Sequence, residues 1–358
     1  MNATTLTLPA AAVDVGYFST KYTWGRKLVN GKSSVEAALF PSIAPRVQKS
    51  IDHIVGSAAL EGVSIPMDGV SYFVGPDASI RSGGRDSRVA LEHYATTAEY
   101  RALAMGSLHA IAGRALDGKR QMEQMDIQTL VVGLPLNTLD QYRDSVAAIF
   151  KGVHTLPPLA GRSNPMVVQV KRCEVVAQPQ GALVRYAAEK DQQALQGNTL
   201  VLDMGGGTFD WFLTTGTKPM HDRCGAHPKG MLSCTHVVCD QIADRLRNDP
   251  LVVARIDKAV CDDLPSVKIN GKDVELAAYR NSVDAILAEC VNRMLETVGS
   301  LAAVDTIVVT GGGGKRLYPV LQRLLPERSD SIYVDGDPIF SNVAGFHYLA
   351  ELINRGQA

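Results

Sequence analysis

One short pattern occurs twice in this chain and strongly limits the folds that the chain can adopt. Residues 11–21 read AAVDVGYFSTK, and residues 199–210 read TLVLDMGGGTFD. In both segments an aliphatic and β-branched run ends in Asp-x-Gly, and small or hydroxyl residues follow. The pattern is typical of a strand that turns tightly into a β-hairpin, because glycine permits backbone geometry that other residues avoid. Two such hairpins predict two related half-domains that close on one ligand.

The residues of the two hairpins indicate that this ligand is a nucleotide. Backbone N–H groups in such turns can bind phosphate oxygens, and a strand-end Asp can hold hydrated Mg²⁺. In the first hairpin the candidate residues are Asp14, Gly16, Tyr17, Phe18, Ser19, Thr20 and Lys21. In the second hairpin they are Asp203, Gly205, Gly206, Gly207, Thr208 and Asp210. Lys21 can neutralise phosphate charge, whereas the three glycines allow the backbone to approach a ligand closely.

Two further segments fit the same interpretation. TIVVTGGGGKRL (306–317) predicts a strand, a glycine turn and a helix N-terminus, which favours phosphate and sugar binding. Its candidate residues are Gly311, Gly312, Gly313, Gly314 and Lys315. In VAQPQGALVRY (176–186), Gln180 lies where a strand turns into a helix. Its amide could orient an attacking water, and the neighbouring Gln178 is an alternative for that role.

A stretch dense in His and Cys also suggests a metal site, but its spacing argues against one. The residues are His221, Cys224, His227, Cys234, His236 and Cys239. No Cys-x-x-Cys pair occurs, and Cys234 and Cys239 lie five residues apart, on different faces of a helix. We therefore interpret these side chains as structural or incidental.

Composition is that of an ordinary folded protein. Of its residues, 46% are hydrophobic and 20% are charged. The length of 358 residues is enough for two domains. The net charge of −1 gives no general attraction to nucleic acid, so direct nucleic-acid binding is not expected. The six cysteines lie between positions 173 and 290 and suggest free thiols in a cytoplasmic protein. We see no signal peptide and no membrane-spanning apolar stretch, so no membrane partner is expected.

Strand and helix patterns alternate along the chain, which predicts α/β layers. Predicted strands and hairpin arms cover 9–15, 17–24, 127–136, 166–177, 199–203, 208–214 and 331–335. Predicted helices cover 90–116, 138–151, 178–190, 232–247, 275–301, 315–325 and 340–352. Thr138 is the predicted N-cap of its helix, and Asn270-Gly271 predicts a hairpin turn. Residues 30–88 are interpreted as an insertion with a small β element, and the last helix is expected to pack on the first half.

In this order, the motifs resemble those of the actin superfamily of ATPases. VDVGYFSTK and VLDMGGGTFDW are similar to its two phosphate loops, and IVVTGGGGKRL is similar to its adenosine motif. LVVGLPLNT and DPIFSNVAGF (337–346) resemble its two connecting segments. Within the superfamily, the chain most resembles plasmid-partition proteins of the ParM/StbA type, with a further likeness to the PRTRC-system actin-like proteins.

The resemblance implies a duplicated two-domain, ribonuclease H-like α/β fold with a nucleotide cleft between the domains. Domain I would comprise residues 1–177 plus 336–358, and domain II residues 178–335. The family's cofactors are ATP and Mg²⁺, so Asp14 and Asp203 would hold the metal through water. The catalytic set would then comprise Gln180, Asp203, Asp14 and Asp210.

The resemblance also implies a function, an ATPase that polymerises head to tail and acts in plasmid segregation. A DNA-binding adaptor protein would link such a filament to its cargo. Two alternatives stay open at this point. One is a kinase of the same fold that phosphorylates a small molecule, either a sugar or an acid, and the other is a nucleotide-switched adaptor that does not polymerise.

Overall fold

The computed structural model describes residues 4–29, 31–47, 58–83, 93–119, 122–190 and 192–356. The chain forms two compact units. The first comprises Met1–Leu134, Thr138–Val176 and Phe346–Ala358, and the second comprises Pro135–Asn137 and Ala177–Gly345. The domain boundaries expected from the sequence, at residues 177 and 336, stay a prediction.

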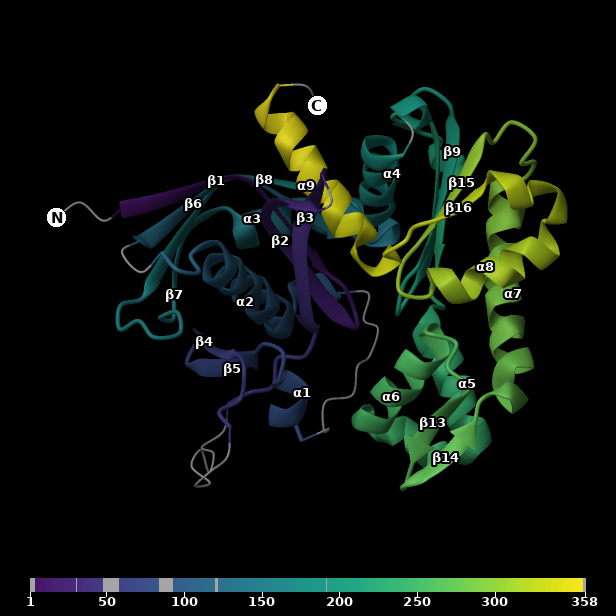
Figure 1. The fold of residues 1–358 in the computed structure, drawn as a ribbon, viewed down its shortest axis with the longest axis horizontal. Coiled ribbons are helices and arrows are strands. Elements are labelled where there is room, and N and C mark those ends of the chain that lie inside the picture. The colour runs from purple at the N-terminus through teal and green to yellow at the C-terminus, as the bar shows by residue number, and fades with distance from the viewer. Residues whose placement is uncertain are drawn as a thin grey trace. The chain divides into compact units, whose positions relative to one another are not determined.

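A six-stranded sheet organises the first unit (Figure 1), in the order β3-β2-β1-β6-β8-β7. Its strands are β1 (Thr4–Val15), β2 (Ser19–Val29), β3 (Lys32–Pro41), β6 (Met122–Leu134), β7 (Gly152–Leu156) and β8 (Met166–Ala177). β1 runs antiparallel to β2 and parallel to β6. Parallel strands are normally buried on both faces, and the β1 residues from Ala10 to Val13 accordingly have at most 2% of their surface exposed.

Helix α2 (Ala98–Ala115) packs against β1 and β2 and contributes much of the first unit's core. Its buried residues lie all around the helix, as expected for a helix inside a core. The sequence places its start at residue 90, whereas the structure starts it at Ala98, after a 3₁₀ turn at Tyr94–Thr96. Thr97 ends that turn and caps the helix, because its hydroxyl accepts the Tyr100 N–H at 3.1 Å. Residues 84–92 lie outside the described residues.

Two further expectations for this part of the chain need correction. Helix α3 (Leu136–Phe150) begins directly after Pro135, so Thr138 lies within the helix and is not its N-cap. Residues 32–41, expected in an insertion, form β3 and pair along the whole of β2. The small β element expected further on is present as β4 (Val63–Met67) and β5 (Val70–Val74), followed by the short helix α1 (Ala78–Arg81).

The second unit has its own sheet, in the order β11-β10-β9-β15-β16, with β12 paired to β10. Its strands are β9 (Asn198–Met204), β10 (Phe209–Thr215), β11 (Lys218–Pro219), β12 (Gly225–His227), β15 (Thr306–Thr310) and β16 (Ile332–Val334). Helix α4 (Gln178–Glu189) covers one face, whereas α7 (Arg280–Val298) and α8 (Gly314–Leu324) cover the other (Figure 1). Side chains alternate accordingly, since Val201 packs with α4 while Leu200 and Leu202 face the larger core.

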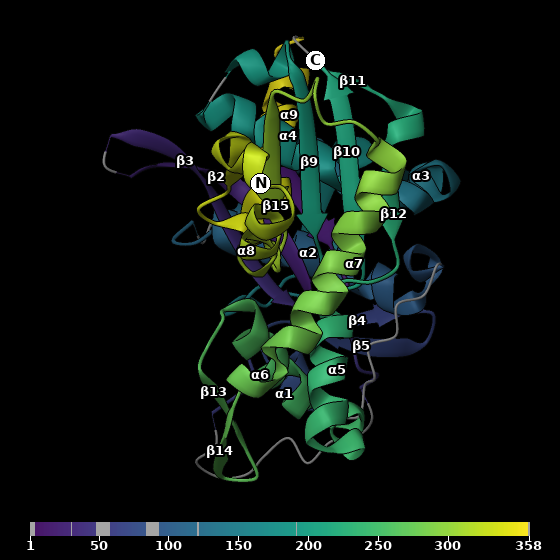
Figure 2. The same cartoon turned by 90° about the vertical axis from the view of Figure 1, so that its right-hand side faces the viewer.

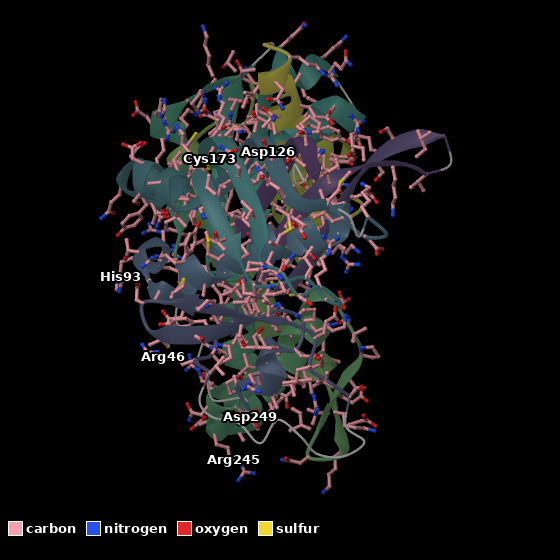
Figure 3. The ribbon with its side chains drawn as sticks, turned by 90° about the vertical axis from the view of Figure 1, so that its left-hand side faces the viewer. Arg46, His93, Asp126, Cys173, Arg245 and Asp249 are labelled. Carbon is pink, nitrogen blue, oxygen red and sulfur yellow. The ribbon has the colours of Figure 1, made fainter. Side chains whose placement is uncertain are left out.

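The remaining helices extend one end of the second unit (Figure 2). They are α5 (Met231–Ala243) and α6 (Pro250–Cys261). Helix α6 was not expected from the sequence, although Asp249, labelled in Figure 3, caps it by accepting the Leu251 and Val252 N–H groups at 3.0 and 3.2 Å. The predicted hairpin is confirmed as β13 (Ser266–Ile269) and β14 (Lys272–Glu275). Asn270 and Gly271 have φ of 50° and 76°, as a type I′ turn requires.

Helix α9 (Ser341–Asn354) contributes its first residues to the second unit and the rest to the first. In the first unit, Thr23 Oγ lies 2.9 Å from His347 Nδ1, and Arg26 pairs with Glu351 at 3.0 Å. These contacts confirm that the end of the chain packs on the first half. No helix in the described ranges is both long enough and apolar enough to cross a bilayer.

Candidate functional site

The two Asp-x-Gly hairpins have the same backbone geometry. In the first, the Gly16 N–H donates to the Ser19 carbonyl at 3.2 Å, and in the second the Gly205 N–H donates to the Thr208 carbonyl at 3.0 Å. In each case the glycine N–H closes the turn. Phosphate binding by these turns would therefore depend on the other predicted N–H groups, which follow the first glycine of each turn.

Strand register places a cation beside the Asp of the first hairpin and a second carboxylate beside the Asp of the second. Asp14 lies across from Lys21 in the pair β1–β2, and Lys21 Nζ is 3.2 Å from Asp14 Oδ2. Asp203 lies across from Asp210 in the pair β9–β10. The position seven residues after the Asp is thus occupied by a cation in one hairpin and by a second carboxylate in the other.

Asp210 is buried, with 2% of its surface exposed, and both of its oxygens accept hydrogen bonds. Thr208 Oγ donates to Oδ2 at 2.6 Å, and the Leu136 N–H donates to Oδ1 at 3.3 Å. Burial raises the pKa of Asp210 to about 7, and the negative charge of Asp203 adds to the increase, although the two hydrogen bonds oppose it. Asp210 can therefore gain or lose a proton near neutral pH.

Asp203 is enclosed by two segments far away in the sequence. Asn342, near the start of α9, donates from Nδ2 to Asp203 Oδ2 at 2.6 Å. A Cβ atom on Gly311 would lie 2.3 Å from Asp203 Oδ1, so only glycine allows this approach. Gly311 also has φ of 84°, which glycine adopts without strain.

The glycine run after β15 links the second hairpin to the start of α8. The Gly313 N–H donates to the Met204 carbonyl at 3.0 Å, and the Gly311 N–H donates to the Pro338 carbonyl at 3.1 Å. Gly314 begins α8, which confirms the predicted turn into a helix. Gly312 and Lys315 are exposed, and a Cβ atom on Gly312 would meet nothing within 4 Å. This exposed corner of the turn is where a ligand could contact the glycines.

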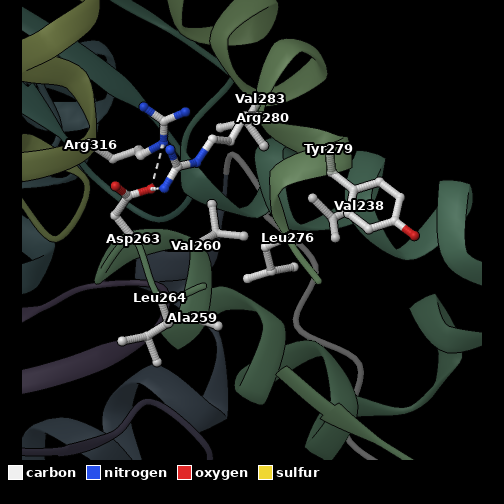
Figure 4. Close-up of a pocket in the computed structure, with 10 residues that line it drawn as sticks. All are labelled: Val238, Ala259, Val260, Asp263, Leu264, Leu276, Tyr279, Arg280, Val283 and Arg316. Atoms are coloured by element: carbon white, nitrogen blue, oxygen red, sulfur yellow. Dashed lines mark hydrogen bonds and ion pairs between the residues drawn. The ribbon is translucent and has the colours of Figure 1, made fainter. Parts of the chain in front are cut away.

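Arg316, directly after Lys315, is buried and pairs with Asp284. It lines a cavity of about 20 Å³ together with residues of α5, α6 and α7 (Figure 4). Arg280 and Asp263, which form a 3.0 Å ion pair, also line this cavity. A cavity of that volume can hold one water molecule and is too small for a nucleoside.

Gln178 and Gln180 both lie in the first turn of α4 and are half-buried. Two residues apart on a helix, they face different directions. The first turn of α4 touches the N-terminal part of α9, because a Cβ atom on Gly345 would lie 1.7 Å from the Gly181 carbonyl oxygen. The geometry therefore keeps both glutamines as candidates.

Three groups at this site were not identified as site residues from the sequence, namely Asn342, the Leu136 N–H and the Pro338 carbonyl. Asn342 and Pro338 belong to the closing motif DPIFSNVAGF, so the motif itself was the available indication. The Leu136 backbone has no side-chain signature, so nothing in the sequence could have identified it.

Each unit, taken by itself, offers groups that suit a magnesium nucleotide. Mg²⁺ prefers oxygen ligands and keeps several waters, as carboxylates such as Asp14 and Asp203 at strand ends allow. A glycine turn at a helix N-terminus suits phosphate oxygens. In the part of the chain that the structure describes, no cluster of three or more His, Cys, Asp and Glu side chains forms a direct metal site.

Comparisons with known proteins agree with this architecture. Residues 12–181 match the family model for the N-terminal domain of actin-like proteins. Residues 201–323 match the model for the C-terminal domain of the archaeal actin homologue, MreB-like. Comparison with curated protein sequences returns no significant match.

Solved structures of actin-like proteins share the fold over nearly the whole chain. Alp7A superposes with a TM-score of 0.71 at 16% identity, covering 99% of this chain and 98% of its own. A 15-stranded ParM filament from Clostridium botulinum gives 0.67 at 18% identity, covering 98% and 99%. Bacillus thuringiensis ParM with ATP gives 0.65 at 15% identity, covering 97% and 98%.

These likenesses confirm the predicted two-domain actin-like fold and the resemblance to ParM-type proteins. The two family models together match most of the chain, in the order expected. The chain therefore belongs to the actin-like proteins.

Proposed function

We propose that the protein is a cytoplasmic ATPase that binds ATP and Mg²⁺ and assembles into filaments that segregate DNA. The observation that best supports this proposal is the doubled hairpin, in which two turns of the same geometry carry different partners for their Asp. Asp14 has Lys21 beside it, whereas Asp203 has Asp210. One hairpin is thus suited to neutralise phosphate charge and the other to hold a cation and a water.

Each unit supplies its own groups for the nucleotide. Asp14 and Asp203 would hold Mg²⁺ through water, and Lys21 would offset phosphate charge. Backbone N–H groups of residues 17–20 and 206–208 would donate to phosphate oxygens. Gly311 to Gly314 would contact the adenosine. The bound Mg²⁺ would neutralise charge that develops on the phosphates during transfer.

Hydrolysis also requires a positioned water. Gln180, or Gln178 beside it, would orient that water with its side-chain amide. Asp210 is placed to assist, since its pKa of about 7 lets it accept a proton near neutral pH. Assembly would be head to tail, because a repeated contact between different surfaces that does not close produces a filament. A separate adaptor would bind DNA, since the net charge of −1 gives no general attraction to it.

Light scattering and electron microscopy of the purified protein test the proposal. We expect polymers with ATP and with a slowly hydrolysed ATP analogue, and none without nucleotide. Asp203→Ala should abolish hydrolysis. Absence of polymers at all protein concentrations tested, despite nucleotide binding, would instead support a switch that does not polymerise.

One observation favours a second candidate, a small-molecule kinase. Phosphoryl transfer to a hydroxyl requires a carboxylate base, and Asp210 has a pKa suited to that role. Both of its oxygens already accept hydrogen bonds, which disfavours Asp210 as the sole base for a hydroxyl, whereas the ATPase needs it only to assist the glutamine. Incubation with radiolabelled ATP and a panel of sugars and small acids separates the two functions. Label on a small molecule indicates a kinase, and label released only as phosphate indicates an ATPase.

A further inference from the structure

Asn342 makes a contact that the activity as proposed does not use. Its side chain is buried, with 7% of the residue exposed, and its Nδ2 donates to Asp203 Oδ2 at 2.6 Å. Turning the amide over would bring two oxygens together, so the nitrogen must face the carboxylate. A hydrogen bond between an amide and a charged carboxylate is stronger than one between neutral groups, and it fixes the carboxylate's orientation.

The backbone around Asn342 is held in place by its own contacts. Ser341 Oγ donates to Asp335 Oδ2 at 2.5 Å, and Arg185 of α4 pairs with Asp335 Oδ1 at 3.4 Å. Gly345, one turn further along α9, lies directly against Gly181. Asn342 therefore reaches Asp203 from a rigid helix start and not from a loop.

The other side of the amide has no partner. Asn342 Oδ1 is buried and accepts no hydrogen bond from any residue that the structure describes. Buried amide oxygens nearly always have a partner, so an unsatisfied one indicates a ligand or water that completes the site. The proposed ligand near Asp203 carries suitable donors, because waters bound to Mg²⁺ donate strongly.

We propose that Asn342 is a positioning residue for the magnesium site, and this inference rests on the proposed binding of ATP and Mg²⁺. Nδ2 holds the Asp203 carboxylate in one orientation, and Oδ1 accepts a hydrogen bond from a magnesium-bound water. Groups that orient metal ligands in this way commonly contribute 10- to 100-fold to metal affinity. Asn342 is thus assigned a role in the affinity for Mg²⁺ and not in the hydrolysis step.

The test measures how strongly nucleotide binding depends on Mg²⁺. A fluorescent ATP analogue is titrated into the full-length protein at a series of Mg²⁺ concentrations. For Asn342→Ala we expect the Mg²⁺ concentration at half-maximal binding to rise about 10- to 100-fold. Asn354→Ala is the matched control, because Asn354 lies at the other end of α9 and also forms a side-chain hydrogen bond, with Thr129 at 2.6 Å. That control should match the wild type.

A double-mutant cycle separates positioning from a loss of packing. If Asn342 acts by way of Asp203, the effect of Asn342→Ala should largely disappear in an Asp203→Asn background. An equal effect in both backgrounds would overturn the proposal, as would an unchanged Mg²⁺ dependence in Asn342→Ala. If Asn342→Ala does not fold, Asn342→Leu keeps the shape and carries the same expectations. A wild-type protein that binds no nucleotide at any Mg²⁺ concentration would instead refute the proposed function.

Discussion

Asp203 and Asp210 lie across from each other in the strand pair β9–β10, so the second hairpin places two carboxylates side by side. In the first hairpin the equivalent positions hold Asp14 and Lys21, which form an ion pair at 3.2 Å. A carboxylate beside a buried carboxylate disfavours its ionisation, whereas a cation favours it. The same backbone turn therefore carries opposite electrostatics in the two units.

The pKa of Asp210 makes folding stability depend on pH. In the unfolded chain the Asp210 carboxyl ionises near its ordinary pKa of 3.8, but in the folded protein it stays protonated up to about pH 7. The folded state thus binds more protons between these values, so this residue makes stability fall as pH rises from about 4 to about 7. In Asp210→Asn that contribution, roughly 4 kcal/mol, should be absent. Urea unfolding of both proteins across this range measures it, and parallel pH profiles would contradict it.

His347 in the first unit should change the pH dependence of folding stability in the opposite direction. Burial and the nearby charge of Arg26 lower its pKa from 6.5 to about 4, so the folded state keeps it neutral. Between pH 4 and 6.5 the unfolded state binds more protons, and the residue therefore makes stability rise with pH. His347→Asn, which keeps an acceptor for Thr23, should remove roughly 3 kcal/mol of that rise. The same urea experiment tests it, and a variant as pH-dependent as the wild type would show the assignment to be wrong.

Gly311 and Gly312 form a matched pair for testing the close approach to Asp203. In Gly311→Ala the new Cβ atom would lie 2.3 Å from Asp203 Oδ1 and 2.4 Å from the Met204 carbonyl oxygen, at a φ of 84°. We expect a loss of at least about 2 kcal/mol of stability. Gly312→Ala meets nothing within 4 Å and should be nearly neutral. Equal thermal unfolding midpoints for the two variants would contradict this account.

The two glutamines of α4 can be separated by hydrolysis kinetics. Gln180→Ala should slow ATP hydrolysis about 100-fold and leave ATP affinity nearly unchanged, because it would orient only the attacking water. Gln178→Ala should hydrolyse ATP at close to the wild-type rate. The reverse result would show that Gln178 orients the attacking water. Wild-type rates in both variants would show that neither glutamine of α4 does so.

Lys21 should contribute to nucleotide affinity by its charge. Lys21→Gln removes a cation beside Asp14, and we expect ATP to bind about 10-fold more weakly, with a smaller dependence on salt. Lys27→Gln is the control, since Lys27 lies on the same strand and is exposed. Isothermal titration at two salt concentrations measures both variants. Equal loss of affinity in both would indicate a general charge effect and not a contact by Lys21.

The sequence by itself determined the local structure of the site. Strand, turn and strand follow each Asp-x-Gly because aliphatic runs and glycine dictate backbone geometry over a few residues. The spacing of seven residues then fixed which side chain lies beside each Asp. The turn into a helix after the glycine run was predicted for the same reason.

The tertiary structure decided what surrounds those carboxylates. Asn342 reaches Asp203 from 139 residues away, and the Leu136 N–H reaches Asp210 from 74 residues away. Likewise, only strand pairing assigned residues 32–41 to the main sheet. Such contacts depend on how distant segments pack, and a backbone N–H group or a buried amide leaves no periodic pattern in the sequence. The pKa of Asp210 follows from that packing, because burial and neighbouring charge, not residue type, set it.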